Sequence, residues 1–305
     1  MDVQILESKS SKAISVVQFR TAEQDTFLYK SASYAIKHNM IEVKEVSDSG
    51  SVNDLFVINY SDYYVFFMDG DILKGAKQNR VLNTSVLLRP KTKTVLPVSC
   101  VEAGRWRYSS SKFDMEDKYS APAMMRFSKA KKVSRNLEER RCYDADQSDV
   151  WKNVAGLHDL NEVHSETSNL SDIYYSKEED LNSAIKDFEA NKDANGIAVF
   201  VNGKLSGIDV FNRKDVYEEY FTKILNGIAM ESRYSRNKAE GFDEEKAGEK
   251  VQEFIRDFDS KAKKEYNAVG AGTERRFAAK DIAGFELHYN DDLIHMGVNS
   301  FKGSE

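Results

Sequence analysis

Two short stretches of the chain concentrate side chains that bind or transform polar ligands. The first places five strong hydrogen-bonding groups within seven residues, and these are Lys77, Gln78, Asn79, Arg80 and Asn83. The second, residues 102–106, combines a carboxylate, a glycine, a guanidinium and an indole. Both stretches adjoin apolar runs that predict buried strands. A solvated turn does not require such a set, although a plain loop can carry it by chance, so these residues are the first candidates for a site.

The second stretch has the parts of a site for a nucleotide-like ligand. Arg105 is suited to phosphate, Trp106 to stacking on a base, and Glu102 to a ribose hydroxyl or to acid–base catalysis. The alternative interpretation is structural: Glu102 and Arg105 pair to close the end of a strand. For Trp106 alone a position in the core is favoured, because large aromatic side chains are usually buried.

The cysteine and histidine residues give weaker signals. No neighbour marks Cys100 as a nucleophile, and a buried structural thiol is the favoured interpretation. His158 and His164 have acidic neighbours, but their spacing fits no helical ligand pair, so no metal site is predicted. His295 follows an apolar pair, which indicates a partly buried histidine that can also reach a site built elsewhere.

Composition narrows the class of protein. A net charge of −6 and a pI near 5.6 argue against a general nucleic-acid binder. No signal peptide is visible, and the apolar runs are far shorter than the roughly 20 residues that cross a bilayer. The two cysteines lie far apart, which favours a reducing, cytoplasmic setting. No phosphate-binding loop, dinucleotide fingerprint, nucleophile elbow or zincin motif appears, so several enzyme classes are disfavoured and no cofactor is identified.

The elements that must position these residues predict an α+β fold in a single domain, residues 1–305. At least seven short strands in the N-terminal part favour a sandwich or a barrel. The expected segments are a β-rich core (12–108), a mainly helical insertion (109–195), a hairpin plus helix (196–231), a charged helical elaboration (233–267) and terminal strands returning to the sheet (273–301).

Local signals define several elements more closely. Asn202-Gly203 between apolar runs predicts a type I′ hairpin over residues 196–211. Ser176 and Glu179 form a capping box that predicts a helix over residues 176–191. Residues 47–51 are a turn cluster. Apolar residues at helical spacing predict helices over residues 214–231 and around residues 251–258.

The two polar stretches also carry a resemblance to a known family. Residues 75–84 (GAKQNRVLNT) and 98–106 (VSCVEAGRW) resemble the bacterial ADP-ribosylglycohydrolase and rhodanese-phosphatase associated protein domain family. Residues 203–211 (GKLSGIDVF) and 293–296 (LIHM) are similar to its later blocks, with less specific motifs. The resemblance spans about residues 12–301 and implies a link to ADP-ribose or NAD metabolism, without implying a reaction.

Three hypotheses follow. The first is a cytoplasmic protein that binds an anionic nucleotide-derived small molecule, such as an ADP-ribose-like ligand, through the polar stretches with Asn83, Trp106 and His295. The second is an enzyme on such a ligand, with Glu102 as general acid or base and Arg105 stabilising negative charge. The third is a non-catalytic module that docks a protein partner through the helical middle and residues 233–267.

Overall fold

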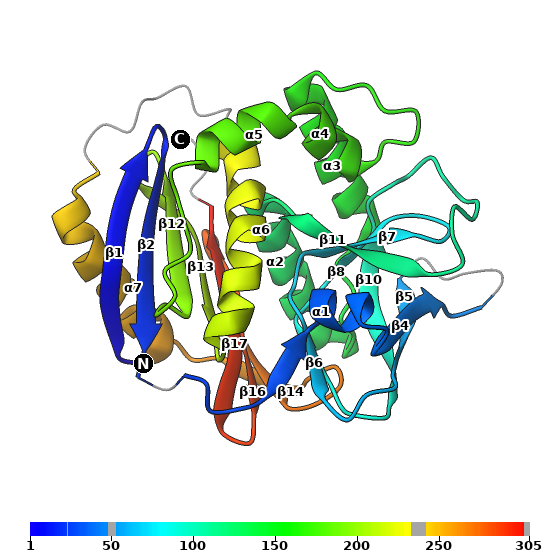
Figure 1. Cartoon of the computed structure of the whole chain (residues 1–305), viewed down its shortest axis with the longest axis horizontal. Coiled ribbons are helices and arrows are strands. Elements are labelled where there is room, and N and C mark those ends of the chain that lie inside the picture. Colours follow the sequence, from blue (N-terminus) through cyan, green and yellow to red (C-terminus); the bar gives the residue numbers. More distant parts are fainter. Residues whose placement is uncertain (23, 48–52, 233–241, 302–305) are drawn as a thin grey trace.

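Three β-sheets carry the fold, and helices cover and separate them, as the computed structural model shows (Figure 1). The structure describes residues 1–22, 24–47, 53–232 and 242–301. The mixed α+β class predicted from the sequence is confirmed. Among the described residues, no helix is both long and apolar enough to span a bilayer.

The largest sheet has eight antiparallel strands and joins both ends of the chain. Its order is β1 (Val3–Ser11), β2 (Ile14–Thr21), β12 (Gly196–Val201), β13 (Lys204–Phe211), β17 (Asp292–Ser300), β16 (Ile282–Tyr289), β15 (Thr273–Ala278) and β14 (Lys264–Asn267). The predicted hairpin is β12–β13, and its turn residues Asn202 and Gly203 both have positive φ, as a type I′ turn requires. The predicted terminal strands join this sheet.

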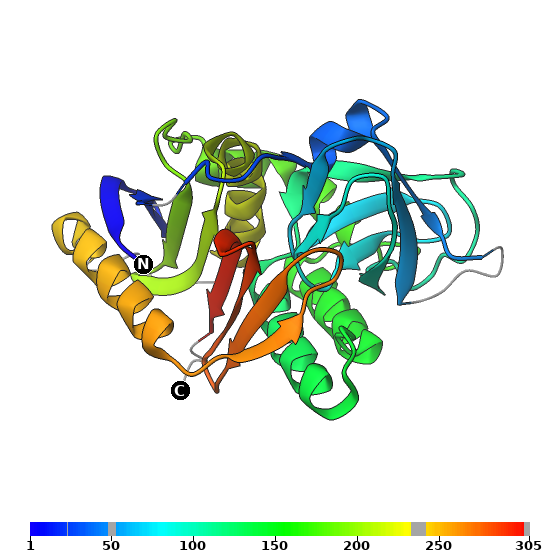
Figure 2. The same ribbon diagram turned by 90° about the horizontal axis from the view of Figure 1, so that it is seen from below.

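Helices cover both faces of the eight-stranded sheet. Helix α7 (Glu244–Ser260) buries Val251, Ile255 and Phe258 against one face, in the same apolar cluster as Val17 and Val210. Figure 2 shows α7 beside the curved sheet. Helix α6 (Lys214–Ser232) packs on the other face of this sheet and also contacts strand β11 (Phe113–Ser120), which belongs to a different sheet.

Residues 29–120 form two smaller sheets around a separate apolar core. The six-stranded sheet has the order β11 (Phe113–Ser120), β7 (Asp71–Gly75), β8 (Arg80–Leu82), β10 (Lys93–Cys100), β5 (Asp54–Asn59) and β4 (Ile41–Glu45). The three-stranded sheet has the order β3 (Tyr29–Ser31), β6 (Tyr64–Phe67) and β9 (Val86–Leu88). Residues of both sheets, such as Val57, Phe67 and Leu96, bury each other, as in a sandwich.

The remaining helices lie in the first and middle parts of the chain. They are α1 (Ala32–Lys37), α2 (Ala123–Arg140), α3 (Gln147–Asn161), α4 (Leu170–Ser176) and α5 (Glu178–Ile185). Pro122 is the N-cap of α2 and has an extended backbone, so it lies just before the first turn of the helix rather than in it.

Several local predictions are wrong. Ser176 does not begin a helix, because it is the last residue of α4; α5 begins at Glu178 and ends at Ile185. The strands β1 and β11 were not expected, and β2 belongs to the eight-stranded sheet rather than to the sandwich. The predicted turn at residues 47–51 falls largely outside the described residues, as does the 233–241 part of the charged elaboration.

Two glycines test how tightly their surroundings are packed, Gly272 in the connection between β14 and β15 and Gly156 in α3. Gly272 has a φ of +97°, and a Cβ there would lie 2.0 Å from the backbone oxygen of His288. We expect Gly272→Ala to lower the free energy of unfolding by more than ~2 kcal/mol. Gly156 lies in α3 with no atom within 4 Å of an added Cβ, so Gly156→Ala should raise the free energy of unfolding by ~0.5–1 kcal/mol. Urea denaturation of both variants measures the contrast, and equal effects would contradict it.

Candidate functional site

The two polar stretches meet where β8 begins and β10 ends. We call Lys77, Gln78, Asn79, Arg80, Glu102 and Arg105 the Glu102 cluster. All six are largely buried, and Arg80 is completely so. Residues 76–79 form the turn between β7 and β8, and residues 101–106 follow β10. The antiparallel pairing of β8 with β10 brings the two stretches together.

Glu102 accepts hydrogen bonds on both carboxylate oxygens. Oε2 accepts from the backbone N–H of Asn79 at 3.0 Å and from Nη2 of Arg105 at 2.6 Å. Oε1 accepts from Nε of Arg105 at 2.8 Å and from the hydroxyl of Thr167 at 3.1 Å. The carboxylate therefore joins the β7–β8 turn, the segment after β10 and the connection between α3 and α4.

The guanidinium of Arg105 also bonds backbone groups of two loops. Nη1 donates to the carbonyl oxygens of Ala76 at 2.6 Å and Arg107 at 3.1 Å, and to the hydroxyl of Ser109 at 3.0 Å. Gly75 lies under this loop with a φ of +120°, and a Cβ there would be 2.5 Å from Ser110 Oγ. Only glycine fits this approach, which keeps residues 105–110 against the turn.

Gln78 and Arg80 complete the buried side of the cluster. Nε2 of Gln78 donates to the carbonyl of Glu102 at 2.7 Å, and Nη1 of Arg80 donates to the carbonyl and side chain of Gln78. Arg80 lies 3.7 Å from Glu45. Cys100 is opposite Arg80 in the register, and burial raises the pKa of its thiol to about 11. The thiol is therefore protonated near neutral pH, which agrees with the predicted structural cysteine.

Trp106 is not in the core, contrary to the sequence-based prediction. Its exposed fraction is 47%, and that of Tyr108 is 51%. The Nζ atom of Lys77 lies 5.3 Å from the Trp106 ring centroid and 5.2 Å from that of Tyr108. The guanidinium of Arg80 lies 5.8 Å from the Trp106 ring. Hydrogen bonds from Arg105, rather than apolar packing, hold this loop, so its rings remain at the surface; we call Trp106 and Tyr108 the aromatic pair.

Asn83 and His295 bond residues outside the Glu102 cluster. Asn83 accepts from Ser99 at 2.8 Å and donates to the carbonyl of Tyr143 at 3.1 Å. His295 is completely buried rather than partly buried, and it bonds Ser85 and Asp209. These two predicted site residues therefore support other parts of the fold.

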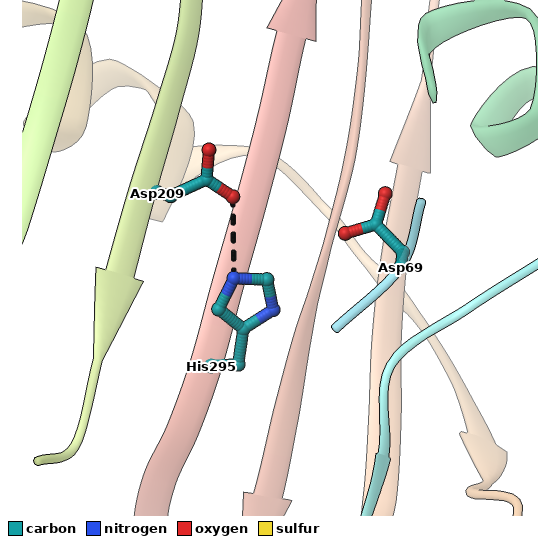
Figure 3. A group of neighbouring side chains, drawn as sticks. All are labelled: Asp69, Asp209 and His295. Atoms are coloured by element: carbon teal, nitrogen blue, oxygen red, sulfur yellow. Dashed lines mark hydrogen bonds and ion pairs between the residues drawn. The ribbon is translucent and has the colours of Figure 1, made fainter. Parts of the chain in front are cut away.

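A second polar cluster lies in the interior where the two parts of the fold meet. We call Asp69, Ser85, Arg126, Asp209 and His295 the Arg126 cluster, and Figure 3 shows its two carboxylates and its imidazole. Arg126 on α2 donates to both oxygens of Asp69 at 2.8 and 3.0 Å, and to both oxygens of Asp209 at 2.6 and 2.9 Å. Asp209 is on β13, whereas Asp69 follows β6, so one guanidinium joins the eight-stranded sheet to the sandwich.

His295 extends this cluster in a way that resembles a serine–histidine–aspartate arrangement. Its Nε2 lies 3.2 Å from Asp209 Oδ1, and its Nδ1 lies 2.9 Å from Ser85 Oγ. Ser85 Oγ also accepts from the backbone N–H of Asp69. Ser85 and His295 have no exposed surface, so a substrate has no access to the hydroxyl, and the geometry is that of a satisfied structural network.

Glycines make room for Arg126 on both sides. A Cβ at Gly70 would lie 3.1 Å from its Cδ and Cγ, and one at Gly297 would lie 3.3 Å from Nη2. Burial favours the neutral form of Arg126, but Asp209 and Asp69 outweigh it and hold its pKa well above the ordinary value. Burial likewise acts against the Asp209 carboxylate, and Arg126 overcomes this to lower the pKa of Asp209.

The same residues have a donor set that suits a metal ion. Ligand atoms of Asp69, Asp209 and His295 lie within 4.8 Å of one another. The guanidinium of Arg126 donates to both carboxylates and supplies the positive charge that an ion would supply. The residues therefore fit an internal arginine cation better than a metal ion.

Lys129 brings a further titratable group to this interior. It lies about one turn after Arg126, is buried, and its Nζ donates to the carbonyl of Leu82. Burial lowers the pKa of Lys129 to about 7, with Asp69 opposing that effect and Arg126 adding to it. Lys129 belongs to a basic run, residues 129–135, and such runs are usually solvated helix faces. Lys129 is buried instead, because α2 lies between the two parts of the fold.

Removing the guanidinium of Arg126 should destabilise the folded chain. We expect Arg126→Met to lower the free energy of unfolding by about 3–5 kcal/mol, because two carboxylates remain buried without a partner. The triple variant Arg126→Met/Asp69→Asn/Asp209→Asn should recover part of this loss. Arg135→Met removes an exposed i,i+4 pair on the same helix and should change stability by less than ~0.5 kcal/mol. Urea denaturation of these variants measures the free energies of unfolding. Similar decreases for Arg126→Met and Arg135→Met would contradict a stabilising role for the hydrogen bonds between Arg126 and the two carboxylates.

Lys129 should make stability depend on pH. Its pKa is lower in the folded chain, about 7 against 10.5, so the unfolded chain binds more protons between these values. The free energy of unfolding should therefore rise with pH from about 7 to about 10.5, relative to Lys129→Met, by a few kcal/mol. The matched variant Lys152→Met, at an exposed position of α3, should run parallel to the wild type. A constant difference between wild type and Lys129→Met across this range would contradict the shift.

Comparison with known proteins gives one match. Neither the curated proteins nor the solved structures contain a match to this chain. The family model described as the ARG and Rhodanese-Phosphatase-superfamily-associated Protein domain matches residues 2–298. This range includes the Glu102 cluster, the aromatic pair and the Arg126 cluster. The chain belongs to this family, which is associated with ADP-ribosylglycohydrolases (ARG) and rhodanese-phosphatases.

Proposed function

We propose that this protein binds an anionic, nucleotide-derived small molecule at the aromatic pair and Lys77. A planar base stacks on the exposed ring of Trp106 or Tyr108, and a phosphate group meets the ammonium of Lys77. The observation that carries the proposal is a pair of exposed rings held on a fixed loop around a cation.

The surroundings of the aromatic pair support this assignment. A shallow recess of about 530 Å³ is lined by Tyr108, Ser109, Ser110 and Ser111. Hydroxyl and backbone groups beside an aromatic face suit the sugar and phosphate parts of a nucleotide. Arg80 lies behind the Trp106 ring and adds positive charge to the same region.

Within this proposal the Glu102 cluster positions the loop. Arg105 donates to Glu102, Ala76, Arg107 and Ser109, so its hydrogen-bonding groups serve the protein. Phosphate contact is assigned to Lys77, because its ammonium lies beside both exposed rings, while Arg105, Glu102, Gln78 and Asn79 fix the turn and the loop. An enzymatic role for Glu102 receives less support, because four donors already engage its oxygens.

The family context suggests which ligand to test first. The family is associated with ADP-ribosylglycohydrolases, and this association fits ADP-ribose or a related nucleotide. A cytoplasmic location goes with this proposal. Protein docking through α7 receives less support, because its apolar residues are buried against the eight-stranded sheet.

Ligand binding can be measured by calorimetry with ADP-ribose, NAD and AMP. We expect Trp106→Ala to weaken binding by about 5- to 150-fold, as expected for loss of one stacked base. Lys77→Met should weaken binding of the phosphate-bearing ligands, because it removes the cation at the aromatic pair.

Matched variants separate this site from general surface effects. Trp151→Ala removes the only other tryptophan, which is 38% exposed on α3. Lys112→Met removes an exposed lysine that pairs with Glu42. Both variants should bind like the wild type. Absence of binding by the wild type to all three nucleotides would overturn the proposal.

A further inference from the structure

A cleft of about 630 Å³ lies beside the end of the eight-stranded sheet where α7 finishes. It is lined from β2, β15, β16, β17 and the connection between α7 and β14. The lining residues that carry charge or an imidazole are Asp2, Asp259, Lys261, Lys263, Arg275, Glu286, His288 and Asp291. Its volume suits a small ligand.

The strand register places three of these side chains on one face of the sheet. Arg275 on β15 is directly opposite Glu286 on β16. His288 follows Glu286 by two residues and therefore points to the same side. Leu293 on β17 is opposite His288 and adds an apolar wall. Lys263 reaches this face from the connection after α7.

Glu286 holds an imidazole and an ammonium at the same time. Its Oε1 lies 3.0 Å from Nζ of Lys263, and its Oε2 lies 3.3 Å from Nε2 of His288. The side chains of Glu286 and Lys263 are each 8% exposed, whereas that of His288 is 20% exposed. Burial alone would raise the pKa of Glu286, but His288 and Lys263 lower it overall, so the carboxylate is ionised.

The inner part of the cleft carries both cations and carboxylates. Lys263 pairs with Glu286, and Arg275 pairs through its Nε with Glu265 at 2.9 Å. Lys261 and Asp259 line the same cleft, whereas the acidic residues Asp2 and Asp291 are exposed. An anionic group that enters the cleft meets Lys263 and Arg275 beside an imidazole that Glu286 holds in place.

We propose that this cleft binds a small molecule through an oxyanion, either a phosphate or a carboxylate. Lys263 and Arg275 hold the oxyanion, and the imidazole of His288 hydrogen-bonds it. Glu286 is a positioning residue, because it fixes the imidazole through Nε2. The site is separate from the aromatic pair and does not depend on ligand binding there.

The alternative role of these residues is to fasten the α7–β14 connection to the sheet. A Lys263–Glu286–His288 network would do so without any ligand. The two roles differ in what added oxyanions do to His288, and this difference is measurable.

Proton NMR of the histidine side chains tests the proposal, since the chain has only five. Inorganic phosphate, and citrate as the carboxylate probe, are titrated at constant pH, with sodium chloride at matched ionic strength as control. His288 should shift saturably with at least one probe, whereas the exposed His38 and His164 should follow the salt control. The two titrations distinguish phosphate from carboxylate.

Variants then assign the shift to the cleft. Lys263→Met and Arg275→Met should each weaken the phosphate or citrate response of His288 by at least about fivefold, the loss of one charge-assisted hydrogen bond. The matched variant Lys264→Met removes the next lysine, which is 63% exposed and pairs with Glu138, and should respond like the wild type.

Two results would overturn the proposal. One is a His288 that responds to both probes no more than His38 and His164 do. The other is an equal response in the wild type and in Arg275→Met, whose half-exposed side chain can be removed without emptying the interior. A folding defect in Lys263→Met, seen by circular dichroism, leaves Arg275→Met to decide.

Discussion

The arrangement of the sandwich and the eight-stranded sheet depends on the hydrogen bonds that Arg126 donates to Asp69 and Asp209. Asp69 belongs to the sandwich and Asp209 to the eight-stranded sheet, and both carboxylates are buried. Two buried carboxylates at such an interface would repel each other without the guanidinium between them. The glycines at 70 and 297 and the position of α2 follow from the space this side chain needs. A buried ion network is weak evidence for net stability, and the role of this one is to join the two parts of the fold through a single guanidinium.

The Glu102 cluster repeats this principle on a smaller scale near the surface. A carboxylate and a guanidinium join a turn, a loop and the α3–α4 connection, and the aromatic pair is displayed as a result. The polar residues that stand out in the sequence mostly hold the site in place, while fewer residues present themselves to a ligand. Rigid display of two rings lowers the conformational entropy that binding would otherwise cost.

Much of the fold could be predicted from local patterns, and the failures have physical causes. The alternation in β4 and the apolar stripe of α6 reflect burial, and Asn202-Gly203 supplies the positive φ that its turn requires. A sequence displays all three directly. The strands β1 and β11 were missed because each lies at a sheet edge, where pairing on one side allows a polar composition. The two polar stretches adjoin β8 and β10, and they meet because these two strands pair. The partners of Arg126 lie 57 and 83 residues away, and no local pattern connects them. Trp106 was misplaced because composition cannot indicate that hydrogen bonds, rather than packing, hold its loop.

The strand order of the eight-stranded sheet has a consequence for synthesis on the ribosome. The β1–β2 hairpin is made first, yet the inner edge of β2 pairs with β12, which begins at Gly196. At 5–20 residues per second, that edge waits on the order of ten seconds or more for its partner. During this interval a nascent chain exposes Val16, Val17 and Phe19 next to unpaired backbone groups. Neighbouring ribosomes on one message carry the same strand, so β2 offers an open edge for pairing between nascent chains until β12 has been made.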